Sequence, residues 1–250
     1  MCVSFLNKRY HGSFFPSYSA STSIVHALIS SENLVDYFTN SDIAISENAN
    51  ETIWEIEWTA LSNPGVNSAL GAFFAYNGNH RSILMRQNFY ALFDATDVRK
   101  SLFRTAGAPT TDEPLGVWTT KHPRGNSEAN FAMNTKVFRM TEALFVKWEA
   151  MAKSGQGAEA LAEVNAFATS RGGSTYSGDA LEAVLAEKRK EFFAEGVRFF
   201  DLKRNNLPIN KGTNCFGTSC NVPANDRLFV LPIPRGEMNL NEFMTQYPEW

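Results

Sequence analysis

The sequence lacks the features that mark a membrane-spanning, exported or nucleic-acid-binding protein. No apolar run approaches the ~18 residues that a membrane span needs. The first ten residues contain no basic stretch followed by a long apolar one, so no signal peptide is visible. Either the chain is cytoplasmic, or an export signal lies outside this sequence. The net charge of −3 at pH 7 gives no electrostatic footprint for nucleic acid.

Catalytic motifs and metal-binding spacings are missing as well. There is no glycine-rich phosphate loop and no Gly-x-Ser-x-Gly or His-Glu-x-x-His sequence. The four histidines are scattered and have no metal-ligand spacing: His11, His26, His80 and His122. The sequence therefore argues against an enzyme, and neither a cofactor nor a metal site is expected.

Cysteine is scarce, with three residues in the chain. Cys215 and Cys220 lie in a loop rich in Gly, Thr, Ser and Asn, where a disulfide is feasible if their Cα atoms come within roughly 7 Å. Such a bond would imply an oxidising compartment, and two free thiols are the alternative. Cys2 is left over. Lipoproteins are acylated on an N-terminal cysteine, but no lipobox precedes Cys2.

Phenylalanine is abundant, with 20 residues, most of which we expect in the core. Residues 31–38 predict a helical turn, and residues 52–58 alternate well enough for a short strand. Residues 105–130 carry many glycines and prolines and predict a long irregular connection. Beyond residue 227 the chain is predicted to be extended, because prolines at alternate positions exclude a central strand.

Between these segments the pattern predicts helices. Residues 156–169 predict one helix, and Asp179 can cap the next, with Glu182 completing a capping box. An earlier helix, which ends before Gly155, is predicted by five apolar residues at helical spacing: Val137, Met140, Leu144, Trp148 and Met151. Two antiparallel helices with short links favour a helical hairpin, as in repeat proteins.

Residues 187–204 are the most informative part of the chain, because they alternate acids, bases and aromatic rings in an order that few folds need. The first part reads as a charged helix. Gly196 fits the left-handed position at which a helix ends. Arg198 and Asp201 are three apart in the turn that we expect to follow.

We expect these charges to form a buried ion-pair network that locks the helix to the next segment, with an intrahelical pair between Lys188 and Glu191. A catalytic pair such as Glu191 and Glu195 is the alternative. Two such carboxylates must flank a scissile bond, and neighbours on one helix face cannot flank a sugar from opposite sides. The predicted network is Glu187, Arg189, Glu191, Glu195, Arg198, Asp201 and Arg204.

The order of these residues resembles the C-terminal signature of the SusD/RagB family of outer-membrane nutrient-binding lipoproteins. Phe192 stands where leucine is usual in that signature. Further segments resemble family motifs in the same order along the chain: residues 52–56, residues 138–143, Leu231-Pro232-Ile233-Pro234 with Glu237, and residues 246–250. The match covers roughly residues 45–250.

The resemblance implies a mainly α protein, with a SusD-like helical fold of tetratricopeptide-like helix pairs, long loops and a few short strands. It divides the chain into an unfamiliar, partly irregular segment (residues 1–44) and a SusD/RagB-like C-terminal domain (residues 45–250). Members of the family are typically about twice as long. Their N-terminal half supplies the signal, the lipidated cysteine and most of the tetratricopeptide-like helices.

The function that the resemblance implies is non-catalytic glycan binding at the bacterial cell surface. The ligand would be an oligosaccharide or a starch-like nutrient, and no cofactor is needed. The protein would be lipid-anchored at the outer membrane and would deliver its ligand to a SusC-like TonB-dependent transporter. Nucleic acid is not an expected partner. The alternative is a helical-repeat scaffold that contacts other proteins and binds no ligand.

A glycan site needs aromatic faces on which sugars stack and polar side chains that bind hydroxyl groups. The segment after the predicted strand and the Pro/Gly-rich connection supply both. Tyr76 and Trp118 are favoured because turn signals surround them, whereas Trp148 has core spacing and should be buried. The predicted ligand-binding residues are Trp58, Tyr76, Asn79, Arg81 and Trp118.

Overall fold

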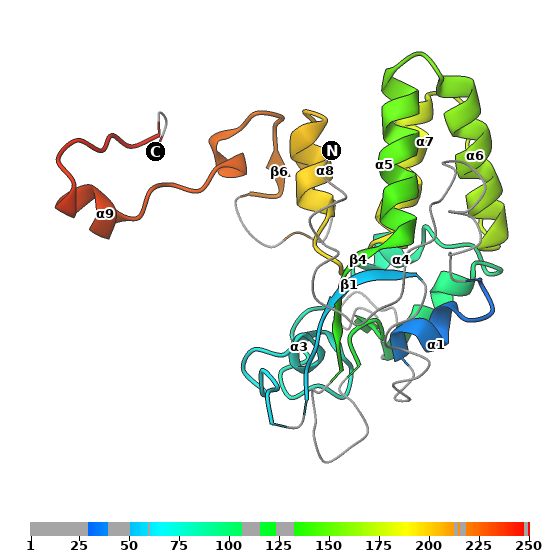
Figure 1. The fold of residues 1–250 in the computed structure, drawn as a ribbon, viewed down its shortest axis with the longest axis horizontal. Helices are drawn as coiled ribbons and strands as arrows, with labels where there is room; N and C mark the ends of the chain where they lie inside the picture. The colour runs from blue at the N-terminus through cyan, green and yellow to red at the C-terminus, as the bar shows by residue number, and fades with distance from the viewer. Residues whose placement is uncertain are drawn as a thin grey trace, which may run out of the picture.

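The computed structural model describes a mainly helical fold, which confirms the predicted fold class (Figure 1). The described residues are 30–39, 51–59, 61–106, 116–123, 133–212, 215, 219–247 and 250.

Three helices stand side by side at one end of the molecule (Figure 1): α5 (Met140–Lys153), α6 (Gly157–Ser170) and α7 (Ala180–Glu191). Each turns an apolar stripe toward the others, so that Phe145, Val164 and Val184 are fully buried between them. α7 begins where the Asp179 carboxylate accepts a hydrogen bond from the Glu182 N–H (2.9 Å), which is the predicted cap. The predicted helical hairpin is present as α5 and α6.

α5 begins later than its apolar spacing predicted. Val137 does not lie on a helix, because strand β4 (Thr135–Arg139) pairs antiparallel with strand β1 (Thr52–Ile56). The ladder hydrogen bonds hold this segment extended up to Arg139, the residue that precedes the helix. The strand predicted at residues 52–58 is confirmed over most of its length.

A second core lies at the foot of these three helices, around α1 (Leu34–Thr39), α4 (Gln87–Tyr90) and the 3-10 helix η2 (Val98–Leu102). The helical turn predicted at residues 31–38 is confirmed by α1. The predicted domain boundary after residue 44 lies outside the described residues. The buried side chains of this core include Leu34, Tyr37, Phe38, Phe89, Phe93, Leu102 and Phe193.

The connection predicted to be irregular contains two paired strands. β2 (Phe103–Ala106) and β3 (Gly116–Thr119) run antiparallel, with Arg104 opposite Trp118. Trp118 therefore lies on a strand and not in a loop. The many glycines and prolines of this segment predicted no strands. They lie mostly between and after two strands that are too short to give a clear pattern of their own.

The C-terminal part begins with α8 (Arg198–Arg204) and a short antiparallel pair, β5 (Ile209–Asn210) with β6 (Asn221–Val222). The segment after residue 227, predicted to be extended, begins instead with the 3-10 helix η3 (Arg227–Phe229). The Asp226 carboxylate nucleates this turn by accepting a hydrogen bond from the Leu228 N–H (2.9 Å).

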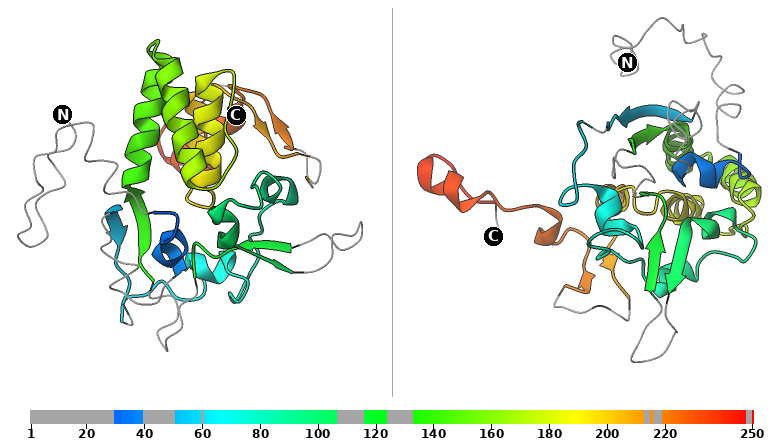
Figure 2. Two further views of the ribbon diagram at one scale, coloured as in Figure 1. Left: turned by 90° about the vertical axis from the view of Figure 1, so that its right-hand side faces the viewer. Right: turned by 90° about the horizontal axis from the view of Figure 1, so that it is seen from below.

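Beyond η3 lies a C-terminal arm, residues 230–247, which includes α9 (Arg235–Leu240). Figures 1 and 2 show the arm projecting away from the helices. α9 has no buried residue, and Leu240 and Phe243 are 87% and 89% exposed. The arm therefore presents apolar side chains that nothing in the described part of the chain covers.

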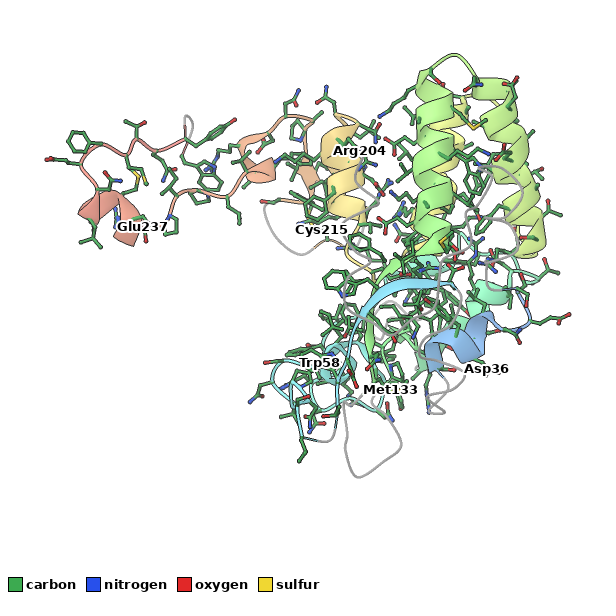
Figure 3. The ribbon with its side chains drawn as sticks, viewed as in Figure 1. Asp36, Trp58, Met133, Arg204, Cys215 and Glu237 are labelled. Atoms are coloured by element: carbon green, nitrogen blue, oxygen red, sulfur yellow. A yellow bond between two sulfur atoms is a disulfide. The ribbon has the colours of Figure 1, made fainter. Side chains whose placement is uncertain are left out.

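Cys215 and Cys220 form a disulfide after α8, with their Cα atoms 5.6 Å apart (Figure 3). No helix within the described ranges is long and apolar enough to cross a membrane. Nor do these ranges place three His, Cys, Asp or Glu side chains together as a metal site would require.

Candidate ligand-binding site

The loop at residues 75–86 carries three of the predicted ligand-binding residues and is held against α3 (Leu70–Phe74). The Ala72 carbonyl oxygen, near the end of that helix, accepts a hydrogen bond from the Arg81 N–H (3.0 Å). Gly78 packs so closely that a Cβ atom there would overlap carbonyl oxygens of α3. Main-chain contacts therefore fix the shape of the loop.

The same loop is attached to strand β3. The Trp118 indole N–H donates to the Arg81 carbonyl oxygen (3.1 Å), and the Met85 N–H donates to the Val117 carbonyl oxygen (2.7 Å). The Trp118 ring lies over Gly116, where a Cβ atom would overlap it. The glycine thus leaves room for the ring to lie along the strand.

Tyr76, Trp118 and two arginines meet on this surface. The Tyr76 and Trp118 ring centroids are 5.1 Å apart, with the rings inclined by 78°. The guanidinium carbon of Arg104 lies 4.1 Å from the Tyr76 centroid, and that of Arg81 lies 5.8 Å from it. Cation–π contacts of this kind orient both ring and guanidinium. We call Tyr76, Arg81, Arg104 and Trp118 the aromatic platform.

The platform stands on a well-packed base. Arg104 and Trp118 share one face of the β2–β3 pair because they are opposite one another. On the other face Phe103 stacks on Phe193 at 4.4 Å, and Val117 is fully buried. One side of the hairpin therefore fills the core while the other side holds the platform.

Of the five predicted ligand-binding residues, the structure brings together Tyr76, Arg81 and Trp118. Asn79 is exposed in the same loop, and its side chain makes no hydrogen bond to any described residue. The sequence reasoning missed Arg104, because no strand was predicted there. A strand pairing that placed residue 104 opposite Trp118 would have found it.

Trp58, labelled in Figure 3, lies elsewhere. It lines a solvent-open cavity whose lining contains no platform residue. Its main-chain N–H donates to Asn134 Oδ1 (2.9 Å), and its indole N–H donates to Thr135 Oγ1 (3.1 Å). These bonds attach the segment after β1 to the start of β4. Trp58 therefore has a structural contact that the sequence did not predict.

Two basic side chains line the wall of this cavity. Lys121 Nζ donates to Glu195 Oε1 and to the Glu191 carbonyl oxygen, both at 2.6 Å. Burial lowers the pKa of Lys121 to about 8. Burial also lowers the pKa of His122, which donates to the Ala194 carbonyl oxygen (2.8 Å). Both side chains are committed to the protein itself.

Glu195 belongs to a buried charge cluster around Arg139, which is 1% exposed. Arg139 Nε donates to Glu195 Oε2 (2.8 Å), and its Nη1 donates to Glu51 and to Glu191 (3.2 Å each). Arg99 reaches the same cluster and donates to Glu187 Oε1 (2.6 Å). The two arginines thus join β4 and η2 to the end of α7.

These contacts set the ionisation of the carboxylates. Burial alone would raise the pKa of Glu191, but the charges of Arg171, Arg139 and Arg99 hold it well below its ordinary value. The pKa of Glu195 is likewise lowered, against its burial, by Arg139 and Lys121. Both side chains are therefore anions at neutral pH. Neither is a candidate general acid, which would need a raised pKa.

The pairing differs from the prediction in detail. Lys188 does not pair with Glu191; its Nζ donates to Asp201 Oδ1 (2.8 Å), because α8 folds back beside α7. Arg204, labelled in Figure 3, reaches Glu149 on α5 (2.6 Å) and also pairs with Asp201. The buried acids are therefore shared between helices, although Asp201 and Glu187 also pair within their own helices, with Arg204 and Lys190.

Two predicted network members have other partners. Arg198 lies in helix α8, not in a turn; its Nη1 donates to the Leu185 carbonyl oxygen (3.4 Å) and forms no ion pair with a described carboxylate. Arg189 packs its guanidinium 5.1 Å from the Phe89 ring centroid. Gly196 has the expected positive φ of 83°, but the helix already ends at Glu191.

The SusD family model matches residues 96–250. The chain belongs to the SusD family. This match covers the buried charge cluster apart from Glu51, and two platform residues, Arg104 and Trp118, whereas Tyr76 and Arg81 precede it. The resemblance seen in the motifs of residues 187–204 is thereby confirmed. A search of curated protein sequences found no match.

Solved structures of SusD-family proteins resemble the chain over most of its length. A SusD superfamily protein from Bacteroides vulgatus aligns with a TM-score of 0.76 at 25% identity, covering 89% of this chain and 50% of that one. A SusD-like carbohydrate-binding protein from the same species aligns at 0.67 and 19% identity, over 86% and 51%. Surface glycan-binding protein A from Bacteroides uniformis aligns at 0.58 and 22%, over 86% and 54%. The chain spans about half the length of these relatives.

Proposed function

We propose that this SusD-family chain binds a glycan on the aromatic platform and does not transform it. The carrying observation is that Tyr76 and Trp118 stand together, with two arginines, on a loop and a strand fixed by main-chain contacts. Rings present apolar faces for pyranose stacking, and nearby polar groups set the orientation of the sugar. The carbohydrate- and glycan-binding relatives of the same fold support this function.

The setting that we propose is the outer face of a bacterial outer membrane, where the bound glycan passes to a SusC-like TonB-dependent transporter. The absence of catalysis is part of the proposal. It rests on Glu191 and Glu195, whose pKa values are held below the ordinary value by arginine and lysine side chains, so that both are buried anions. Such carboxylates have no proton to donate to a glycosidic oxygen.

Calorimetric titration with a panel of plant and host polysaccharides tests the binding site. We expect Trp118→Ala to weaken glycan binding about tenfold or more, because a central aromatic contact is lost. Trp250→Ala is the matched control. Trp250 also donates its indole N–H to a carbonyl oxygen at 3.1 Å and lies beside an arginine, Arg227, but it is not part of the platform.

Equal affinity of the wild type and Trp118→Ala for every bound glycan would overturn the proposed site. Chromatography of the glycan after long incubation tests the non-catalytic claim. Recovery of the polymer at its original length is expected, and its shortening by the pure protein would contradict the claim.

A protein-binding scaffold is the second candidate function, and the exposed apolar side chains favour it. Trp54 and Phe138, on the paired strands β1 and β4, are 46% and 43% exposed with their ring centroids 5.9 Å apart. The C-terminal arm adds Leu240 and Phe243. Tight binding of a purified transporter, with no heat on titration by any glycan, would favour the scaffold.

A further inference from the structure

We infer that the aromatic platform takes an anionic glycan, one that carries carboxylate or sulfate groups. This inference rests on the proposed function and narrows its ligand class. The observation that carries it is the juxtaposition of two exposed arginines, Arg81 and Arg104, whose guanidinium groups lie over one half-buried tyrosine ring, that of Tyr76.

Neither platform arginine has a countercharge among the described residues, where no carboxylate forms an ion pair with Arg81 or Arg104. Arg99, Arg139 and Arg204 differ, since each pairs with at least two carboxylates. The distances of the Arg81 and Arg104 guanidinium carbons from the Tyr76 centroid place these two carbons within about 10 Å of each other. Physiological salt screens the repulsion between two charges only incompletely over this range. An anion between them would remove this repulsion.

The contacts that hold these arginines leave their hydrogen-bond donors available. A guanidinium that lies over a ring uses its flat face, and its N–H groups point outward in the plane of the group. Those edges match the two oxygens of a carboxylate or of a sulfate ester. Tyr76 can therefore orient Arg104 without occupying the donors that would bind the ligand.

The main chain that carries both arginines is already ordered. Arg104 sits opposite Trp118 in the strand pair, and the carbonyl of Arg81 accepts the Trp118 indole N–H. Less side-chain and loop ordering is then required on binding, which favours affinity. The two rings would hold the apolar face of the sugar while the guanidinium edges bind its charged substituent.

Matched pairs of polymers test this inference with the full 250-residue chain. We would titrate polygalacturonate against its methyl ester, and dextran sulfate against dextran, at about 0.15 M ionic strength. The wild type should bind the anionic member of at least one pair tenfold or more tightly than its neutral counterpart. The carboxylate and sulfate pairs distinguish the two sources of charge.

The double variant Arg81→Gln/Arg104→Gln should lose that preference, so that the ratio of the two affinities falls toward one. Arg227→Gln is the control, because Arg227 also stacks on a ring (4.4 Å from the Trp250 centroid) but lies outside the platform. Arg227→Gln should keep the preference for the anionic polymer. This result would distinguish a specific site on the platform from a general attraction of polyanions to positive charge. A preference that survives in the double variant, or that Arg227→Gln also removes, would overturn the inference.

Failure of the inference and failure of the proposed function give different results. If wild type binds charged and neutral polymers equally, and Trp118→Ala weakens both, the platform binds glycans but does not select anions. If Trp118→Ala changes no affinity, the platform is not the glycan site. The absence of any binding contradicts both.

Discussion

Both the buried charge cluster and the aromatic platform contain arginine, but their arginines have different roles. Arg139 is 1% exposed and bonded to Glu51, Glu191 and Glu195, whereas Arg104 is exposed and contacts a tyrosine ring. Where acids surround an arginine, the pair fixes one helix to another. Where only aromatic rings surround it, the charge remains available to a ligand. In this protein the residues around an arginine decide whether it stabilises the fold or is available to bind a ligand.

The same substitution in both regions gives the largest expected difference. Arg139→Met should lower the free energy of unfolding by about 3–5 kcal/mol, because it leaves buried carboxylates without their partner. Arg104→Met should change it by no more than about 0.5 kcal/mol, since the side chain is exposed. Urea unfolding followed by circular dichroism measures both. An equal loss of unfolding free energy in the two variants would contradict the different roles assigned to Arg139 and Arg104.

Acid tests the same contrast without a mutation. The folded-state pKa of Glu191 and of Glu195 lies below the unfolded value, so their stabilisation is complete above the unfolded value of about 4.3. It is lost as pH falls through the folded pKa. The free energy of unfolding should drop by ~2 kcal/mol or more between about pH 5 and pH 2.

Arg139→Met supplies the control for this acid titration, because without that charge the two pKa values move back toward the ordinary range. Its stability should depend less steeply on pH. A slope in the variant as steep as in the wild type would show that other groups dominate the acid response.

The disulfide lies outside both regions, so its removal should affect stability without affecting binding. Removal of the disulfide with Cys215→Ser/Cys220→Ser should cost up to ~2 kcal/mol of stability, because the bond closes only a short loop. It should leave glycan affinity unchanged. Thiol titration in denaturant without reductant should find one free cysteine, Cys2. Three reactive thiols would count against the bond.

The smallest expected effect is on the platform itself. Gly116→Ala places a methyl group where the Trp118 ring now lies, so the ring must move. We expect glycan affinity to fall about fivefold and the free energy of unfolding to fall by about 1 kcal/mol. Gly236→Ala is the control, because no atom lies within 4 Å of the added Cβ. A Gly116→Ala protein that binds as well as wild type would mean that the ring position is unimportant.

The helices were predictable from sequence because their signals are local. Asp179 and Glu182 mark the start of α7, and apolar spacing identifies its neighbours. Local spacing failed at Val137, where pairing with β1 outweighed an apparently helical pattern. It failed again at Lys188, whose partner Asp201 is on another helix. Tertiary packing decides which residues on different helices and strands pair with each other, and the spacing of residues in the sequence carries no information about that packing.

The platform could be predicted only in part. Tyr76 and Trp118 were predicted because they are aromatic residues surrounded by turn signals, and Arg81 because its side chain can bind hydroxyl groups. That the three would meet depends on the strand pair β2–β3 and on the close approach permitted by Gly78. Arg104 became visible only once the strand register was known.

Hydrogen exchange measured by mass spectrometry, with and without a bound glycan, tests whether the aromatic platform binds the ligand while the buried charge cluster only stabilises the fold. We expect added protection in peptides that cover residues 76–81, 103–106 and 116–119, the segments that carry the platform. We expect no change at residues 187–204, which supply Glu187, Glu191 and Glu195 to the buried charge cluster. Protection confined to residues 187–204, with none at the platform, would contradict the assignment of recognition to one region and structure to the other.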